Sequence, residues 1–378
     1  MSEMSYLEKL LDGVEVEWVT LGSMADIGTG SSNRQDESEN GIYPFYVRSK
    51  NILKSDTFEF DEVAIVIPGE GGIGDIFHYV EGKYALHQRA YRIRITTNAV
   101  DTKFLYYFMS SSFKQYILTK SVGATAISIR KPMLEGFKVP IPSPDNPEKS
   151  LAIQSEIVRI LDKFTALTAE LTAELNMRKK QYNYYRDQLL SFKEGEVEWK
   201  TLGEVAVIGT GNHDTQDAIE HGKYIFYARG REPLKLNVFD FDETAIITAG
   251  DGAGVGKVFH YAKGKYALHQ RAYRIVPNAF MNPRFVYHYI TAYFFTYIQK
   301  ASVSSSVTSL RRPMFLKFPI PVPPSEEQAR IVEILDKFDT LTNSITEGLP
   351  REIELRQKQY EYYRDLLFSF PKPETVSN

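Results

Sequence analysis

The chain has 378 residues, with 45 Lys and Arg against 48 Asp and Glu, and it contains no cysteine. This length allows two or three domains, and the lack of cysteine excludes disulfides, iron–sulfur clusters and thiol catalysis. No run of about 18 apolar residues is present, which argues against a membrane-spanning helix, and the acidic start does not resemble a secretion signal. We therefore expect a cytoplasmic protein with no membrane partner. The net charge of −3 weakens the case for a generally basic nucleic-acid-binding protein, so local charge placement decides that question.

The sequence contains one plan twice. VEWVTLGSMADIGTG at 16–30 recurs as VEWKTLGEVAVIGTG at 197–211, an offset of 181 positions. GKYALHQRAYRI at 82–93 recurs without change at 264–275. Such self-similarity predicts two structurally equivalent halves. Further pairs are SIRKPM with SLRRPM (128–133 and 309–314), IVRILDKF with IVEILDKF (157–164 and 331–338), and QYNYYRDQLLSF with QYEYYRDLLFSF (181–192 and 359–370).

The front part of each copy is rich in β-branched and aromatic residues and is punctuated by glycine. This composition predicts strands joined by turns. One helix is expected over 101–119, because Phe104, Phe108 and Ile117 keep a rough helical spacing there.

The back part of each copy has the pattern of one long helix. Ile153, Ile157 and Leu161 step by four residues, and a matching stripe starts at Ile331. A helix of about 40 residues spans roughly 60 Å, which is longer than a domain core can cover. We therefore predict that the two helices pack as an antiparallel coiled coil. Whether the region around Gly348 and Pro350 breaks the second helix is left open.

The predicted fold class is α+β. Two β-rich domains in a pseudo-two-fold arrangement are separated by two long antiparallel coiled-coil helices. Residues 7–18 loosely repeat the joint at 189–199, so the repeat is expected to be circularly permuted. The expected segments are an N-terminal segment near the C-terminal helix (1–13), a first β-rich domain (14–147), a central long helix (148–194), a second β-rich domain (195–324), and a C-terminal long helix with a tail (325–378).

The order of these motifs closely resembles the specificity subunit of type I restriction–modification enzymes. Each β-rich domain is followed by PIP, then I-V-x-I-L-D-K-F, then QYxYYRD, and the match covers essentially the whole chain. The helical segments resemble the IC branch in particular. The resemblance implies a non-catalytic subunit whose two target-recognition domains each read one half of a split site in double-stranded DNA.

The resemblance also implies partners. The helices would dock two methyltransferase subunits, and restriction and translocase subunits would join that core. Adenine-N6 methylation and DNA cleavage would then reside in the partners, together with S-adenosylmethionine, ATP and Mg²⁺, and the chain would have no cofactor of its own. Tandem TAEL units at 168–175 each add one helical turn of about 6 Å, and in the IC branch such units set the gap between half-sites. Without the family, they simply continue a good helix.

Enzyme and metal interpretations find little support. GEGGIG at 69–74 fits a dinucleotide motif, but strand and turn residues follow it, and the second copy loses the third glycine. An adenine-methyltransferase motif is absent from the sequence. The recurring histidines offer two candidates per domain without a third ligand. We therefore predict no catalytic and no metal-binding residue. A repeat-based protein scaffold that reads no DNA is the alternative function.

The candidate DNA-binding residues lie in glycine loops, basic segments and the repeated ALHQRAYRI. Gln can pair with adenine and Arg with guanine, whereas hydroxyls and basic side chains suit phosphates. If ALHQRAYRI forms one strand, Gln88 and Arg89 point to opposite sides, and its identity in both copies could equally mark a shared structural strand. The candidates are Arg48, Gly71, His87, Gln88, Arg89, Ser128, Arg130 and Lys131, and in the second copy Arg229, Gly252, His269, Gln270, Arg271, Ser309, Arg311 and Arg312.

The repeated QYxYYRD segment is the candidate partner-binding region. Aromatic residues at successive positions cover more than one face of a helix, so one face can pack internally while another meets a partner. Internal packing alone is the simpler alternative. The candidates are Tyr182, Tyr184, Tyr185, Arg186, Tyr360, Tyr362, Tyr363 and Arg364.

Because the two β-rich domains are near-copies, the two halves of the DNA site are predicted to resemble inverted repeats of one another.

Overall fold

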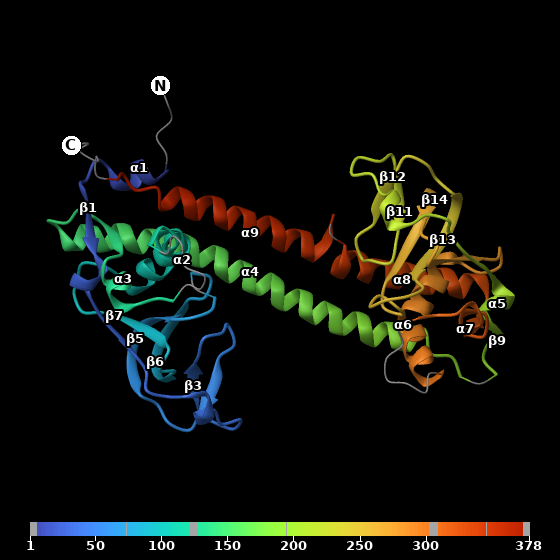
Figure 1. The fold of residues 1–378 in the computed structure, drawn as a ribbon, viewed down its shortest axis with the longest axis horizontal. Coiled ribbons are helices and arrows are strands. Elements are labelled where there is room, and N and C mark those ends of the chain that lie inside the picture. Colours follow the sequence, from blue (N-terminus) through green and yellow to red (C-terminus); the bar gives the residue numbers. More distant parts are fainter. Residues whose placement is uncertain are drawn as a thin grey trace. The chain divides into compact units, whose positions relative to one another are not determined.

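The chain divides into two compact units. One comprises residues 1–170 and 353–378, and the other comprises residues 171–352. Each unit contains one β-rich domain and parts of the long helices (Figure 1). The two-domain α+β class is thereby confirmed. The computed structural model describes residues 6–72, 74–120, 128–193, 195–301, 309–344 and 346–372.

The first unit is built on a six-stranded sheet with the order β2-β7-β5-β6-β3-β4. Neighbouring strands are antiparallel, except that β3 and β6 run parallel. A separate two-stranded sheet pairs β1 with β8. The elements are α1 (Tyr6–Leu11), β1 (Val16–Thr20), β2 (Ala25–Thr29), β3 (Tyr43–Tyr46), β4 (Leu53–Ser55), β5 (Phe60–Pro68), β6 (His78–Leu86), β7 (Ala90–Ile95), α2 (Thr102–Lys120), α3 (Lys131–Glu135) and β8 (Lys138–Pro142).

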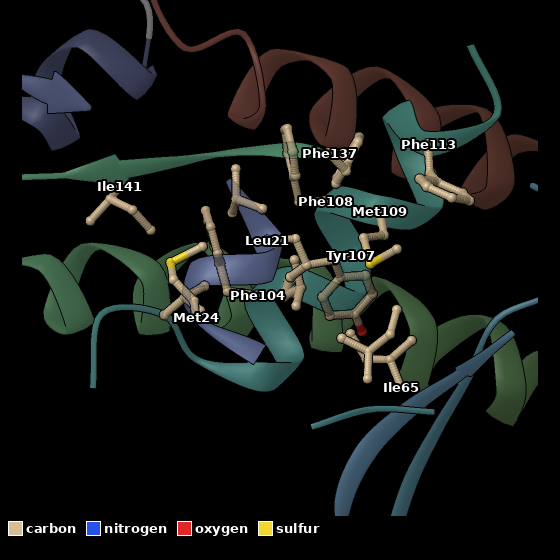
Figure 2. Close-up of a cluster of buried hydrophobic side chains, with 14 of the residues drawn as sticks. Leu21, Met24, Ile65, Phe104, Tyr107, Phe108, Met109, Phe113, Phe137 and Ile141 are labelled. Atoms are coloured by element: carbon tan, nitrogen blue, oxygen red, sulfur yellow. The ribbon is translucent and has the colours of Figure 1, made fainter. Parts of the chain in front are cut away.

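The core of the first unit lies between this sheet and helix α2. Phe104, Phe108 and Phe113 of α2 are buried, as are Ile65 of β5 and Phe137 beside β8 (Figure 2). Burying a side chain of this size contributes about 1.5–3 kcal/mol relative to leaving it exposed. The helix expected over 101–119 is confirmed, because the apolar spacing that predicts it is the spacing that fills this core.

The second unit repeats the architecture. Its six-stranded sheet has the order β10-β15-β13-β14-β11-β12, which matches the first sheet strand for strand. The elements are β9 (Glu198–Thr201), α5 (Leu202–Val205), β10 (Ala206–Thr210), β11 (Tyr224–Tyr227), β12 (Leu234–Leu236), β13 (Phe241–Ala249), β14 (Phe259–Leu268), β15 (Ala272–Pro277), α6 (Pro283–Ala301), α7 (Arg312–Leu316) and β16 (Pro319–Val322).

The two long helical segments differ in continuity. Helix α4 (Pro147–Leu189) runs for 43 residues without a break, as expected. The question left open around Gly348 and Pro350 is answered by the structure, because α8 (Ser325–Asn343) and α9 (Gly348–Leu367) are separate helices with four residues between them. These four residues equal the excess of the second copy between its LDKF and QY motifs, 21 positions against 17. None of the described helices has a stretch long and apolar enough to cross a membrane.

The chemistry of the break is local. Ser344, at the end of α8, adopts an extended conformation with φ of −67° and ψ of 132°. Gly348 has φ of +80°, and a Cβ atom there would overlap the carbonyl oxygen of Thr340. Pro350 then falls in the first turn of α9, where a missing N–H removes no helical hydrogen bond. Glycine and proline therefore start a new helix here.

Within each unit, α4 packs against another helical segment through aromatic rings. In the first unit Phe164 stacks on Tyr363 of α9, with ring centroids 5.3 Å apart. In the second unit Tyr185 stacks on Phe338 of α8 at 5.6 Å. Each stack joins an LDKF phenylalanine to a QYxYYRD tyrosine. The duplicated motifs are thus complementary partners.

The two ends of the described chain meet in the first unit. Leu7 and Leu11 of α1 are buried in the same cluster as Leu367 and Phe370. The indole Nε1 of Trp18 donates to the carbonyl oxygen of Pro371 at 2.8 Å. Helix α1 therefore packs beside the end of α9, which is the arrangement expected of a circularly permuted repeat, whereas residues 1–5 lie outside the described part of the chain.

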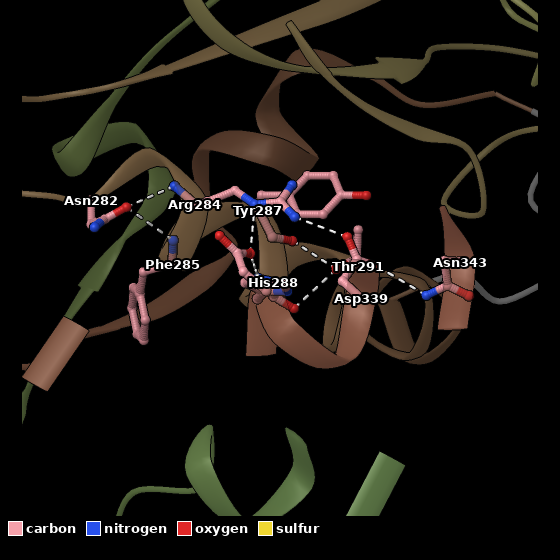
Figure 3. Close-up of polar contacts among 9 residues, drawn as sticks. Asn282, Arg284, Phe285, Tyr287, His288, Thr291, Asp339 and Asn343 are labelled. Carbon is pink, nitrogen blue, oxygen red and sulfur yellow. Dashed lines mark hydrogen bonds and ion pairs between the residues drawn. The ribbon is translucent and has the colours of Figure 1, made fainter. Parts of the chain in front are cut away.

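A polar network ties each β-rich domain to its long helix. In the second unit Asp336 Oδ1 of α8 accepts from Arg284 Nε at 2.8 Å and pairs with His288 Nε2 at 2.7 Å. Arg284 also donates to Asp339 Oδ2 at 2.9 Å (Figure 3). In the first unit, Asp162 of α4 accepts from Lys103 at 2.7 Å and from Tyr107 at 2.6 Å. The same joint is therefore built from different side chains.

Candidate nucleic-acid interface

Four separated segments of the first domain meet around the glycine loop that follows β5. The backbone N–H of Gly69 donates to Arg89 O, and Ile129 N donates to Gly69 O, both at 2.9 Å. His87 N donates to Tyr46 O at 3.0 Å, which draws in the segment after β3. Glu70 and Ser128 form an isolated β-bridge. The backbone therefore gathers candidate residues that lie as far as 80 positions apart in the sequence.

Two candidate arginines converge on one carboxylate at this loop. Arg48 Nη1 and Arg89 Nη1 both donate to Glu70 Oε2, at 3.0 and 3.1 Å. The three side chains remain 43–56% exposed. We call the three residues Arg48, Glu70 and Arg89 the first arginine clamp. It presents two guanidinium groups on the surface with one compensating negative charge.

The second domain has the same arrangement. Arg229 Nη1 donates to Asp251 Oδ1 at 2.8 Å, and Arg271 Nη1 donates to Asp251 Oδ2 at 3.1 Å. We call Arg229, Asp251 and Arg271 the second arginine clamp. Partial burial would raise the pKa of Asp251, but the two arginine hydrogen bonds outweigh it and hold the pKa below its usual value. The carboxylate is therefore ionised at neutral pH.

The residues between β6 and β7 form a turn, so ALHQRAYRI is not one continuous strand. Strand β6 ends at Leu86 and β7 begins at Ala90. Gln88 and Arg89 occupy the turn, and both side chains are exposed. The alternation of a strand does not apply to a turn, so both can face the same ligand. Gln88 donates to the Asn33 side-chain oxygen, and Gln270 donates to Asp214 Oδ2 at 3.1 Å.

His87 and His269 lie beneath this turn and are not surface side chains, with only 7% and 0% of their area exposed. Their Nδ1 atoms accept the backbone N–H of Arg89 and Arg271, at 3.0 and 2.9 Å. Burial lowers the pKa of both imidazoles, and the neighbouring arginine charges lower it further. Each ring therefore supports the turn by accepting one of its backbone hydrogen bonds, and direct DNA contact by His87 and His269 stays a prediction.

The candidate glycines have a conformational role. Gly71 and Gly252 adopt φ of +66° and +81°, although a Cβ atom would meet nothing within 4 Å at either position. The left-handed backbone, and not space, therefore favours glycine there. At Gly69 and Gly250 the reason is space, because a Cβ atom would lie 2.8 and 2.6 Å from the carbonyl oxygens of Arg89 and Arg271.

The remaining candidates border the clamps. Ser128, Arg130 and Lys131 are exposed around the start of α3, and Ser309, Arg311 and Arg312 occupy the same positions at α7. The preceding parts of these segments, 124–127 and 305–308, lie outside the described residues. A cavity of about 320 Å³ beside the first clamp is lined by Arg34, Val47, Arg48, Ser49, Glu70, Gly71 and His87.

Sequence reasoning missed the acidic members of the clamps. A usable signal was present, because an acidic residue occupies the second position of both glycine loops, as GEGG and GDGA. It also missed Asn33 and Asp214, which hold the glutamines. Among the described residues, no three His, Asp or Glu side chains are arranged to hold a metal ion.

The candidate partner-binding residues differ in how far their side chains are exposed. Tyr184 and Tyr362 are 59% and 65% exposed. Tyr182 is half-buried, and its desolvation raises the pKa of its phenol to about 12. The remaining candidates lie in stacking or ionic contacts, namely Tyr185 and Tyr363 on the LDKF phenylalanines, Tyr360 in the first core, Arg186 over Tyr182, and Arg364 over Tyr360.

Comparison with known proteins decides the family. The model of the type I restriction modification DNA specificity domain matches residues 13–178 and again residues 194–355. The chain belongs to this family. Its relatives are also specificity subunits. The type I restriction enzyme EcoR124I/EcoR124II specificity subunit of Escherichia coli is 42% identical over 420 residues, covering 100% of both chains. The EcoprrI specificity subunit of the same species is 37% identical over 92% of this chain and 93% of its own.

Solved structures show the same fold at lower identity. The S subunit of a type I restriction-modification system from M. genitalium superposes with a TM-score of 0.68 at 18% identity, covering 98% of this chain and 100% of that one. A chain from a study of type I R-M complex assembly and conformational transition gives a TM-score of 0.53 at 14% identity, covering 93% and 97%. The resemblance found in the sequence is confirmed, and this specificity subunit carries one arginine clamp in each of its two matched domains.

Proposed function

We propose that this specificity subunit reads a bipartite site in double-stranded DNA, with one arginine clamp and its neighbouring turn on each half-site. The observation that carries the proposal is the recurrence of the clamp. In both domains, segments distant in sequence deliver two exposed arginines to the same glycine loop, and an exposed glutamine lies next to one of them on the adjoining turn. A scaffold that bound only proteins would not need paired guanidinium groups beside an adenine-compatible amide.

The chemistry suits base edges. An arginine can donate two hydrogen bonds to guanine O6 and N7, and glutamine can pair with adenine N6 and N7. Each such bidentate pair contributes about 1–3 kcal/mol of discrimination against a wrong base. The hydroxyl and basic side chains at the starts of α3 and α7 suit phosphate oxygens, which fix position without reading sequence. Direct readout and positioning are thus assigned to adjacent surfaces of one domain.

The target is proposed to be nearly symmetric. The turn residues Gln88 and Arg89 recur unchanged as Gln270 and Arg271, so the two half-sites should resemble inverted repeats where these residues read. The acid of the clamp is Glu in one domain and Asp in the other, and Asn33 corresponds to Asp214. Any difference between the half-sites is therefore expected near these positions.

Catalysis is assigned to partner subunits. We propose a cytoplasmic complex in which two methyltransferase subunits carry out adenine-N6 methylation with S-adenosylmethionine, and restriction and translocase subunits use ATP and Mg²⁺. The specificity subunit would then need no cofactor of its own. The exposed rings of Tyr184 and Tyr362 support a docking role for the QYxYYRD segments, because aromatic residues are enriched in protein interfaces.

Methylation mapping tests this function. Expressing the chain with its methyltransferase partner in a host and mapping N6-methyladenine should yield one bipartite motif with two similar half-sites. A gel-shift assay of the same complex should show preference for that motif and a steep loss of affinity with salt. Arg89→Ala and Arg271→Ala should each relax the motif in one half only. No sequence preference in either assay would favour the scaffold alternative.

A further inference from the structure

The acidic residue of each clamp occupies an unusual position for a DNA-binding surface. Glu70 and Asp251 each place a carboxylate between two arginines that are at least 40% exposed. If these arginines bound only phosphates, a carboxylate among them would oppose binding, because it repels the phosphate and neutralises part of the attraction. The role of the acidic residue is therefore something other than raising the total affinity for DNA.

A backbone hydrogen bond joins the loop that carries the clamp carboxylate to the turn that carries one of the clamp arginines. Gly69 N donates to Arg89 O at 2.9 Å, so the loop that carries Glu70 is tied to the turn that carries Arg89. The second domain repeats this bond between Gly250 N and Arg271 O, also at 2.9 Å. Loop, turn and carboxylate therefore form one unit in each domain. The second arginine of each clamp, Arg48 or Arg229, arrives from a different segment.

We propose that Glu70 and Asp251 are positioning residues that determine specificity, by holding each arginine pair in a geometry that accepts a base edge and disfavours a phosphate. This inference rests on the proposed reading of DNA by the clamps. Each guanidinium uses one N–H on the carboxylate and keeps the others for a ligand. Guanine O6 and N7 are neutral acceptors, so the nearby negative charge penalises them far less than an ionic phosphate oxygen.

The two domains use different geometry to the same end. Both arginines of the first clamp donate to a single oxygen, Oε2 of Glu70. In the second clamp each oxygen of Asp251 accepts from one arginine. Aspartate, although one methylene shorter than glutamate, therefore bonds both arginines in the second domain as Glu70 does in the first. Glu70→Asp and Asp251→Glu therefore provide matched variants that keep the charge and change only its reach.

The test uses the complex of the full chain with its methyltransferase partner, and four variants. Glu70→Gln and Asp251→Asn remove the charge, and the two acid exchanges are the controls. The probes are a duplex carrying the motif mapped for the wild type, duplexes with one or the other half scrambled, and a fully scrambled duplex. Dissociation constants are measured at several salt concentrations, and the methylated motif of each variant is mapped in cells.

Glu70→Gln is expected to lower discrimination against the duplex scrambled in the first half by about 5- to 150-fold, the loss of one base contact. Discrimination in the second half should stay at the wild-type value. Affinity for the fully scrambled duplex should rise, and the slope of log K against log salt should steepen by up to about 2, because two released arginines can each neutralise a phosphate. Asp251→Asn should do the same in the other half, and the acid exchanges should keep most of the discrimination.

Three results would overturn the inference. They are an equal loss of affinity for all duplexes with an unchanged salt slope, an unchanged motif in both charge-removing variants, or relaxation in both halves at once. Glu70→Gln and Asp251→Asn test the same inference in separate domains. If one of the two variants does not fold, the other still gives a result. If the wild-type complex itself prefers no duplex, the proposed DNA-reading function fails. If the wild type is selective and the variants equal it, only the role of the acids fails.

Discussion

Replacing Asp336 by alanine tests how firmly the second β-rich domain is fixed to its long helix. Asp336 Oδ1 pairs with Arg284 Nε at 2.8 Å and with His288 Nε2 at 2.7 Å. The His288 side chain is fully buried, whereas Arg284 is 22% exposed and keeps its bond to Asp339 (Figure 3). The substitution therefore leaves the buried His288 Nε2 without its Asp336 partner, and it leaves the Arg284 guanidinium with only its bond to Asp339.

The magnitude follows from those two losses. An unsatisfied buried donor costs about 1–3 kcal/mol, and a hydrogen bond to a charged group contributes about 1.5–3 kcal/mol when buried. Because Arg284 can be partly hydrated and stacks on Tyr287 with its guanidinium 4.6 Å from the ring centre, we expect only about 1 kcal/mol from it. Asp336→Ala should thus lower the free energy of unfolding of the second unit by about 2–4 kcal/mol.

Two matched variants calibrate the result. Asp162→Ala removes the equivalent acid of the first unit, but Lys103 is 36% exposed and Tyr107 retains Thr165 at 3.3 Å, so a loss of about 1–2 kcal/mol is expected. Glu333→Ala removes a pair that is at least 70% exposed on both sides and should cost less than about 0.5 kcal/mol.

The assay must resolve the two units, because a chain with two compact units need not unfold in one step. Hydrogen exchange of the α6 and α8 amides, followed through a urea titration, reports the second unit by itself. A loss for Asp336→Ala no larger than that for Glu333→Ala would show that the network contributes nothing, and would refute the reasoning from burial.

Three further predictions concern the spacer, the partner surface and pH. Deleting Thr172–Leu175 removes about 6 Å of helix, so the gap of the mapped motif should shorten by about one or two base pairs; an unchanged gap would contradict a spacer role. Tyr184→Ala and Tyr362→Ala should each weaken binding of methyltransferase subunits by about 1–2 kcal/mol in calorimetry, whereas Met177→Ala, at a side chain of α4 that is 45% exposed, should not. Burial lowers the pKa of His269, so below pH ~6.5 the unfolded chain binds a proton that the folded chain does not. Stability is therefore fully present above that pH and falls as the pH decreases toward the folded pKa, by at most about 1.4 kcal/mol per pH unit, and His269→Gln should flatten this dependence in urea titrations.

The sequence predicted the large features because they are encoded locally and twice. Apolar spacing of three or four residues predicts α2 and α4, and both are present. The apolar stripes and the length of the helices predicted paired helical segments, and in each unit an LDKF phenylalanine stacks on a QYxYYRD tyrosine. The break between α8 and α9 was only suspected, although Gly348, Pro350 and the four extra residues all pointed to it.

The candidate site was predicted in composition but not in arrangement. Arg48 and Arg89 were identified by their side-chain chemistry, and the structure brings them to the carboxylate of one loop residue, Glu70. The sequence did not decide whether His87 and His269 are buried or face DNA, because a histidine in a repeated motif has the same letter whether it faces a ligand or supports a turn. Exposure depends on neighbours that come from other segments.

The sequence by itself determined a two-unit, cysteine-free chain with repeated β-rich domains and long helices, and it identified the family. Periodicity and repetition are properties of neighbouring residues, so they survive without coordinates. Only the tertiary structure decided that ALHQRAYRI turns at Gln88, and that Glu70 and Asp251 each hold two arginines from different segments. The physical reason is that such contacts join residues 19–22 positions apart through loop conformation, and loop conformation follows from backbone hydrogen bonds across segments that no local pattern specifies.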